Sequence, residues 1–255
     1  MELPRAVLFD LDDTLAASFE APTPAILERL KTLLSHVPVA IITGRDFTRV
    51  EPDFLPHITP HARAGTFFIL AESGADIYEW DGASWKEEAT AHLSADERVH
   101  IRDVINEAVA TTRALEGLPV FGERFVEKRG QVAFAALGLQ VPADLKYTWD
   151  PQHEKRAALQ RAIATKLPEY DVFLGGATSI DVTRKGVNKA AGVRWVAKRL
   201  SLPVSDMLYV GDAIYPGGND FVVLETGIPT RSTAGPAETE TIIDELLVGY
   251  ATAHT

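Results

Sequence analysis

The stretch AVLFDLDDTL, residues 6–15, places four apolar residues directly before a cluster of carboxylates. The apolar run predicts a short buried strand, with Asp10 and Asp12 at its C-terminal end. Two carboxylates this close repel each other unless a cation compensates their charge. A divalent metal ion is the simplest compensating group, and the alternative is an Asp-rich turn that ends the strand. The rest of the chain decides between these interpretations.

A helix over residues 24–35, with Thr23 as its N-cap, and a second buried strand, Val37–Ile42, follow this stretch. Strand, helix and strand in this order predict a parallel sheet, in which ligands bind at the C-terminal ends of the strands. The second strand ends in Thr43 and Gly44, where the glycine lets its backbone N–H approach the same ligand as the threonine hydroxyl. The alternative is that Thr43 caps the following helix. Arg45 either adds positive charge to this edge or lies on the surface.

The pattern changes in the middle of the chain, where hairpins and helices replace the strand–helix alternation. A capping box at Ser94 and Glu97 predicts a helix, and residues 170–183 predict a hairpin across Gly175 and Gly176. This indicates an antiparallel sheet with helices on one face. We therefore expect an inserted α+β domain over residues 82–183, within an α/β domain formed by residues 1–81 and 184–255.

Charged residues return at two further predicted element ends. Lys189 lies in the first turn of a helix that runs to about residue 200, where a cation opposes the helix dipole unless an anion is near. Lys185 is the competing candidate, and its distance from the helix makes it the weaker one. Asp212 follows the buried strand at residues 207–210, and a Gly-rich loop then leads to Asp220. The alternative for that loop is a simple turn.

The order of these four motifs resembles the haloacid dehalogenase superfamily, subfamily IIB, although most relatives have Gly where this chain has Asp13. The resemblance implies a Rossmann-like parallel-sheet core and a phosphoryl-transfer enzyme that forms an aspartyl-phosphate. The implied catalytic residues are Asp10 as nucleophile, Asp12 as general acid and base, Thr43, and Lys189; Thr43, Gly44 and Lys189 would bind the phosphoryl group. The implied Mg²⁺ ligands are Asp10, the backbone carbonyl of Asp12, Asp212, and Asp220 either directly or through water.

The inserted domain resembles the type C2 cap of the superfamily. Its segment Phe125–Arg129 and Gln131 resemble a sugar-phosphate-binding strand of eukaryotic phosphomannomutases, and Thr178–Val182 resembles a second such strand. The implied substrate-binding residues of the cap are Arg129, Gln131, Ser179 and Asp181. Arg129 could also be an exposed strand charge. Two arginines of the mutases fall on Leu139 and Lys146 of this chain. The apolar side chain of Leu139 lacks the bidentate fork with which an arginine binds phosphate.

Composition limits the classes of partner. The 255 residues include 25 Lys and Arg against 36 Asp and Glu, and the net charge of −11 disfavours nucleic acid. There is no cysteine, so no thiolate metal site can form. No apolar run reaches the roughly 18 residues that span a bilayer, and the first five residues lack a signal-peptide pattern. We expect a cytoplasmic monomer or homodimer that binds a small phosphate ester.

Three functions follow from this sequence. The first is a magnesium-dependent phosphatase that hydrolyses a small phosphorylated metabolite, with a sugar phosphate as the expected substrate. The alternative is a phosphomannomutase that uses the same aspartyl-phosphate, against which the Leu139 position argues. The third is a non-catalytic binding module, which would have no reason to keep buried charges that cost stability.

Overall fold

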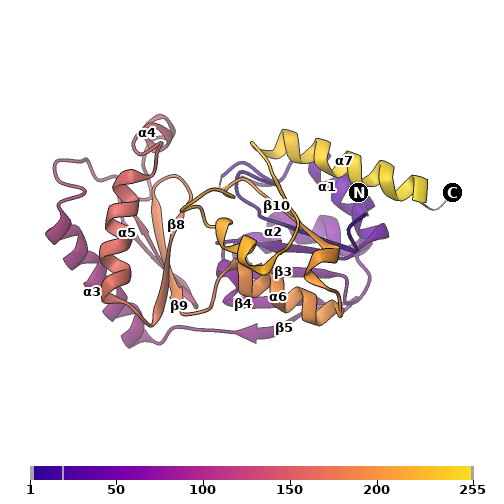
Figure 1. Ribbon diagram of the computed structural model, residues 1–255, viewed down its shortest axis with the longest axis horizontal. Helices are drawn as coiled ribbons and strands as arrows, with labels where there is room; N and C mark the ends of the chain where they lie inside the picture. The colour runs from indigo at the N-terminus through magenta and orange to yellow at the C-terminus, as the bar shows by residue number, and fades with distance from the viewer. Residues whose placement is uncertain (1–2, 19, 254–255) are drawn as a thin grey trace. The chain divides into compact units, whose positions relative to one another are not determined.

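The computed structural model describes residues 3–18 and 20–253, so residues 1, 2, 19, 254 and 255 of the predicted core ranges lie outside the described part. It separates into two compact units, which are described one at a time. The first unit contains Met1–Thr90, Lys189–Ile214 and Asp220–Thr255, and the second contains Ala91–Asn188 and Tyr215–Asn219. Both units can be followed along the chain in Figure 1.

The first unit is built on a seven-stranded sheet with the order β11-β10-β1-β2-β3-β4-β5. Strands β11 to β3 are parallel, and β4 and β5 add an antiparallel hairpin at one edge. The strands are β1 Ala6–Phe9, β2 Val39–Ile42, β3 Phe67–Ala71, β4 Asp76–Trp80, β5 Trp85–Thr90, β10 Met207–Gly211 and β11 Thr230–Ser232. This is the predicted α/β core, with the two central strands β1 and β2 side by side.

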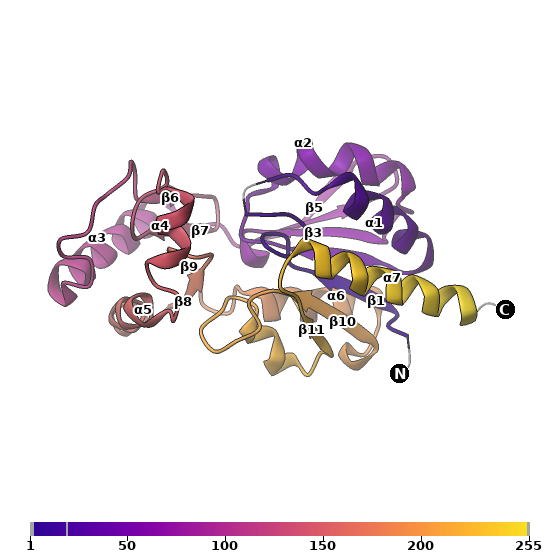
Figure 2. The ribbon, with the colours of Figure 1, turned by 90° about the horizontal axis from the view of Figure 1, so that it is seen from above.

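Helices cover both faces of this sheet (Figure 2). The helices are α1 Pro24–His36, α2 Phe47–Ile58, α6 Lys189–Leu200 and α7 Pro236–Ala253. Alternate residues of β1 explain the two layers, because Val7 and Phe9 pack with α1, α2 and α7, whereas Leu8 packs with α6. Burial of both faces accounts for the continuous apolar runs that the sequence shows in these strands.

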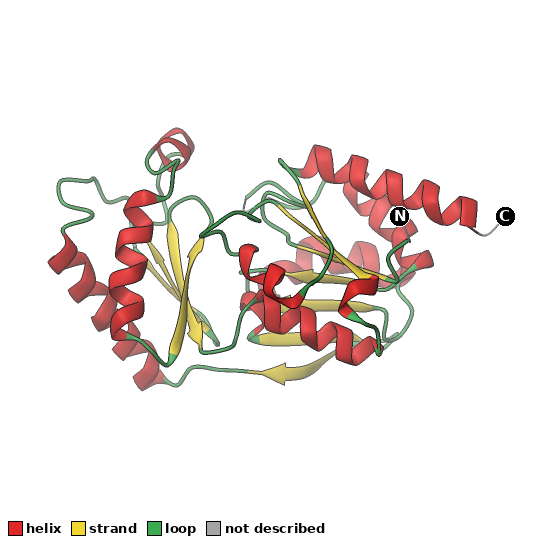
Figure 3. Cartoon of the chain, viewed as in Figure 1, coloured by secondary structure: helices red, strands yellow, loops and turns green. Residues whose placement is uncertain are grey.

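The second unit is an antiparallel sheet with the order β6-β7-β9-β8. Its elements are α3 Ala95–Thr112, β6 Phe125–Glu127, β7 Gln131–Ala135, α4 Ala143–Thr148, α5 Glu154–Lys166, β8 Tyr170–Gly175 and β9 Ser179–Arg184. Helices α3 and α5 lie on the same side of this sheet (Figure 3). Val132 and Phe134 of β7 and Ile180 and Val182 of β9 pack with them in one apolar cluster. The predicted α+β architecture is therefore confirmed.

The structure differs from the sequence prediction at several boundaries. The second unit begins at Ala91 and not at residue 82, because β4 and β5 pair with the large sheet. The bounds of helix α2, which follows Thr43, were not predicted, since Pro52 and Pro56 lie inside it and proline normally ends a helix. Helix α7 ends at Ala253. No helix in the described part of the chain is long and apolar enough to cross a bilayer.

Candidate active site

A buried lysine joins two carboxylates at the C-terminal edge of the large sheet. Asp10 directly follows β1, Lys189 is the first residue of α6, and Asp220 precedes a short 3-10 helix. The Lys189 Nζ donates to Asp10 Oδ1 and to Asp220 Oδ1, each at 2.6 Å. Asp10, Lys189 and Asp220 are 3%, 1% and 0% exposed. The structure thus brings together charges that lie about 180 and 30 residues apart in the sequence.

Burial controls the electrostatics of this cluster. It raises the pKa of Asp10 well above its ordinary value, with Lys189 acting in the opposite direction and Asp220 and Asp212 adding to the rise. Burial and then Asp220 raise the pKa of Asp212 to about 6. Burial alone would lower the pKa of Lys189, but the two anions beside it raise this pKa above its usual value. Three carboxyl groups thus share one lysine, and ionisation of Asp10 and Asp212 is disfavoured by burial and by repulsion among these carboxyl groups.

The donor set fits a hard divalent cation. Carboxylate oxygens of Asp10, Asp212 and Asp220 all lie within 4.8 Å of one another. The set contains only oxygen donors, which suit Mg²⁺, and its unbalanced negative charge would be neutralised by such an ion. Thr14 links the segment after β1 to the loop after β10, because its Oγ1 accepts from the backbone N–H of Asp212 at 3.1 Å. This contact holds Asp212 beside the end of β1.

Asp220 is fixed from three sides. Its Oδ1 accepts from Lys189 and from the Tyr209 hydroxyl, the latter at 2.5 Å, and its Oδ2 accepts from the backbone N–H of Ala213 at 3.1 Å. The carboxylate lies against Gly211, where a Cβ atom would come within 2.4 Å of Asp220 Oδ2. The glycine before Asp212 is therefore required by the close approach of this carboxylate.

Asp12 is held by an arginine that the sequence left between a site role and a surface role. Arg45 Nη2 donates to Asp12 Oδ1 at 2.6 Å, and its Nε lies 3.1 Å from Asp12 Oδ2. The Arg45 side chain is only 9% exposed, against 30% for Asp12. A bidentate guanidinium fixes the plane of a carboxylate as well as its position. Arg45 therefore belongs to the site and orients the Asp12 carboxylate.

Thr43 is fully buried at the end of β2, next to the strand that delivers Asp10. Its Oγ1 accepts from the backbone N–H of Arg45 at 3.1 Å, which leaves the hydroxyl proton to donate to an anion. Its carbonyl accepts from the backbone N–H of Ser73 at 2.8 Å. Glu72 and Ser73 both have positive φ, of 50° and 60°, so a strained turn supports the end of β2.

The predicted cap residues fall into two groups. Gln131 pairs with Thr183 across the strands, and Ser179 and Asp181 lie on the same face of the sheet, opposite the helices. Gln131 is fully buried, and neither atom of its amide has a hydrogen-bond partner among the described residues. Arg129 lies apart from these three, in the exposed turn between β6 and β7.

A buried arginine, Arg156 of α5, holds the turn that precedes Ser179. Its Nη1 donates to the carbonyls of Gly175 and Gly176, at 3.1 and 2.7 Å, and its Nε donates to Asp150 at 3.1 Å. The Ser179 Oγ donates to the carbonyl of Gly175 at 2.6 Å. The turn between β8 and β9 is therefore anchored on α5 by these hydrogen bonds.

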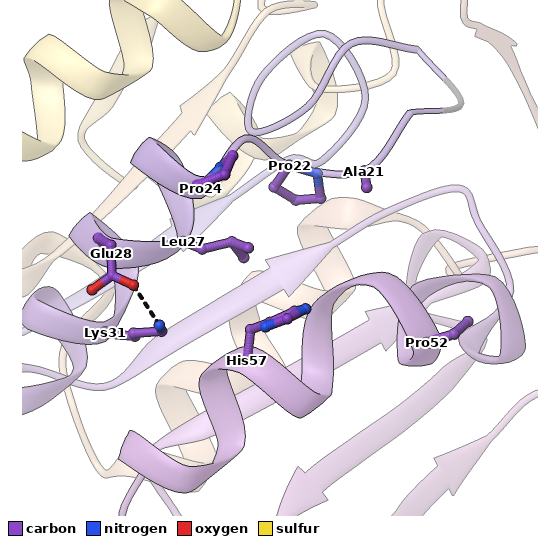
Figure 4. Close-up of a pocket in the computed structure, with 8 residues that line it drawn as sticks. All are labelled: Ala21, Pro22, Pro24, Leu27, Glu28, Lys31, Pro52 and His57. Carbon is purple, nitrogen blue, oxygen red and sulfur yellow. Dashed lines mark hydrogen bonds and ion pairs between the residues drawn. The ribbon is translucent and has the colours of Figure 1, made fainter.

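A pocket of roughly 360 Å³ lies on the first unit, at α1 and α2 (Figure 4). Lys31 and Glu28 form an ion pair of 2.6 Å along one side of it. Its lining residues are Ala21, Pro22, Pro24, Leu27, Glu28, Lys31, Pro52 and His57. None of the motif residues lines this pocket, so it is separate from the acidic cluster.

Comparison with solved structures identifies the class of fold. An IMP-nucleotidase from Plasmodium falciparum superimposes with a TM-score of 0.74 at 17% identity, covering 96% of this chain and 68% of that one. A haloacid dehalogenase-like hydrolase from Bacteroides thetaiotaomicron gives 0.60 at 13% identity, covering 95% and 99%. The fold is that of the haloacid dehalogenase superfamily, a parallel-sheet core with an inserted α+β unit, as the motifs predicted.

The family model of eukaryotic phosphomannomutase matches residues 26–249. The chain therefore belongs to the phosphomannomutase family, and it is an enzyme. A phosphomannomutase from Spinacia oleracea is 25% identical over 222 residues, covering 85% of this chain and 84% of its own. A probable phosphomannomutase from Caenorhabditis elegans is 24% identical over 250 residues, covering 94% of both.

Sequence reasoning missed two residues of the site. Tyr209 lies inside an apolar strand, where its ring is indistinguishable from a core aromatic in the pattern. Arg156 lies in a helix with little apolar periodicity, and nothing in the local sequence indicates its contacts with Asp150 and the turn after β8. In both cases the polar partner comes from another element, so the contact depends on the fold and not on local spacing.

Proposed function

We propose that this enzyme transfers the phosphoryl group of a sugar phosphate through a covalent intermediate on Asp10, and that phosphomannomutase is its activity. The choice of the mutase reaction rests on the family match over residues 26–249. The relatives named phosphomannomutase match over most of their own length, which supports the same choice. This reverses the order of the sequence interpretation, which placed hydrolysis first.

The buried cluster supports the chemistry. An oxygen of Asp10 forms a bond to phosphorus while the bond from phosphorus to the sugar oxygen breaks, and Asp12 gives a proton to that oxygen. Thr43 and Lys189 donate to the equatorial oxygens as their charge changes. In the second half-reaction another sugar hydroxyl attacks phosphorus, Asp12 takes its proton, and the Asp10 carboxylate is restored. Arg45 keeps Asp12 oriented for both proton transfers.

Mg²⁺ would be held by the side chains of Asp10 and Asp212 and the backbone carbonyl of Asp12. Its charge would allow the Asp10 anion to approach an anionic phosphate. Both oxygens of Asp220 already accept hydrogen bonds from the protein, so we assign Asp220 to holding Lys189 and not to binding the metal directly. In the cap we assign the sugar phosphate contacts to Gln131, Ser179 and Asp181.

Hydrolysis is the second candidate, and one observation favours it. Leu139, on which a mutase arginine falls when the sequence is compared without gaps, is 51% exposed and apolar. A mutase must bind a bisphosphate intermediate at two anion sites, and leucine cannot supply the fork that one of them needs. A cap with a single anion site would leave water as the acceptor of the phosphoryl group.

One experiment separates the two reactions. Phosphate release from a panel of sugar phosphates is measured with magnesium and with excess EDTA, beside conversion of mannose 1-phosphate to the 6-phosphate with a bisphosphate primer. Magnesium-dependent, primer-dependent conversion with little free phosphate is expected. Rapid phosphate release without conversion would replace the mutase with a phosphatase, and turnover that is unchanged in EDTA would contradict the metal assignment.

A further inference from the structure

Tyr209 is a buried polar side chain that the reaction described above does not use. It lies in β10, is 0% exposed, and packs among the apolar side chains between the sheet and α6. A phenylalanine would fill the same space without a polar atom to satisfy. The hydroxyl is instead aimed at a carboxylate, and it donates to Asp220 Oδ1 at 2.5 Å. A buried tyrosine hydroxyl normally has such a partner, but here the partner leads directly to the nucleophile.

A continuous chain of hydrogen bonds runs from this hydroxyl to Asp10. Asp220 Oδ1 accepts from both Tyr209 and Lys189, and the same Lys189 Nζ donates to Asp10 Oδ1. The three distances are 2.5, 2.6 and 2.6 Å. Every member is at most 3% exposed. Water therefore cannot easily replace any one of these contacts.

The position of Lys189 depends on how Asp220 is held. Asp220 Oδ2 is fixed by the backbone N–H of Ala213, whereas Oδ1 is shared between Tyr209 and Lys189. Without the tyrosine hydroxyl, Lys189 would be the sole donor to Oδ1 among these contacts. The ammonium group would then be drawn toward Asp220 and away from Asp10.

We propose that Tyr209 is a positioning residue whose hydroxyl fixes Asp220, so that Lys189 stays shared between Asp220 and the nucleophile Asp10. The consequence for turnover rests on the proposed function, because Asp10 is the nucleophile only in that reaction. The consequence for the position of Lys189 does not, because it follows from the hydrogen bonds alone.

The test compares Tyr209→Phe with Tyr250→Phe. Tyr250 is the matched control, since it is also buried and its hydroxyl donates to the carbonyl of Pro4, which is no part of the site. The first measurement is the ¹⁵N NMR signal of the Lys189 ammonium group, identified by its loss in Lys189→Met. The second is kcat and KM for the sugar phosphate that is turned over fastest.

In Tyr209→Phe the Lys189 signal is expected to shift and its protons to exchange faster with water. The kcat should fall about 10- to 100-fold, the usual loss when a residue supporting a metal or catalytic ligand is removed, while KM changes less than about threefold. Tyr250→Phe should leave both measurements as in the wild type. Thermal unfolding of both variants shows that they are folded.

Two results overturn the proposal: an unchanged Lys189 signal in Tyr209→Phe, or a kcat within about twofold of the wild type. If the wild type turns over none of the phosphate esters, the proposed function fails instead. The Lys189 signal then decides the positioning role by itself, because it is measured without substrate.

Discussion

Replacing Lys189 with methionine tests the buried charge cluster through stability, without any assumption about substrate. Methionine keeps the length and apolar part of the side chain but removes the ammonium group. Asp10 and Asp220 would then face each other with no cation between them, at positions that are 3% and 0% exposed. The free energy of unfolding of the variant should therefore be lower than that of the wild type.

The size of the effect follows from opposing terms. Two unit charges 2.6 Å apart attract by about 6 kcal/mol at an effective dielectric constant near 20, and Lys189 makes two such contacts. Desolvation of the lysine offsets most of this attraction. Breaking a buried pair by removing one partner costs about 3–5 kcal/mol in measured cases. We expect a loss of about 3–5 kcal/mol in the free energy of unfolding.

The loss should grow with pH. Burial already raises the pKa of Asp10 in the wild type, and removal of Lys189 takes away the cation that opposes this rise. A carboxyl whose folded pKa is raised stabilises the fold below its unfolded pKa and loses that stability as the pH rises through the folded value. The deficit of Lys189→Met should thus be smaller at pH 5 than at pH 8.

Urea unfolding followed by tryptophan fluorescence measures this loss, because Trp80, Trp85 and Trp195 lie in the first unit. Lys185→Met is the matched control. Lys185 pairs with Asp171 but its side chain is 68% exposed, so its removal should cost less than about 1 kcal/mol. A Lys189→Met variant within about 1 kcal/mol of the wild type at pH 8 would refute the reasoning.

Three further predictions concern separate parts of the molecule. Arg45→Met removes the fork that orients Asp12, so kcat should fall at least about tenfold while thermal stability changes little; an unchanged kcat in steady-state assays would exclude this role. Burial raises the pKa of Tyr250 to about 12, so the stability of the wild type relative to Tyr250→Phe should decrease between pH 10 and 12, by at most about 3 kcal/mol; a constant difference in urea unfolding would contradict it. Ser94→Ala removes the N-cap of α3 and should cost about 1 kcal/mol, measured by urea unfolding of the cap, with no change in kcat.

The sequence predicted most of the large sheet because its strands are buried on both faces. Residues 6–9 and 67–71 read as continuous apolar runs, and the structure has strands over the same residues. The second strand of the hairpin that ends this sheet fell within residues 82–183, which we assigned to the inserted domain. Its strand Trp85–Thr90 carries exposed charges, and only pairing with Asp76–Trp80 reveals the sheet it joins.

The candidate site, like the sheet, could be predicted from the sequence only in part. Asp10, Thr43 and Asp212 each follow a strand end, which the sequence shows directly, and parallel pairing brings these ends together. The contacts of Arg45 and Tyr209 could not be predicted in this way. A bidentate pair or a buried hydroxyl contact depends on side-chain direction across elements, and sequence spacing contains no information on it.

In the proposed reaction, phosphorus becomes covalently bound to Asp10 during turnover. The direct measurement is mass spectrometry of enzyme that is quenched in acid while it turns over mannose 1-phosphate with magnesium. A phosphorylated peptide that contains Asp10 is expected in the wild type, and it should be absent in a folded Asp10→Asn variant, which should also be inactive. Phosphorylation at another residue, or full activity of Asp10→Asn, would contradict the account.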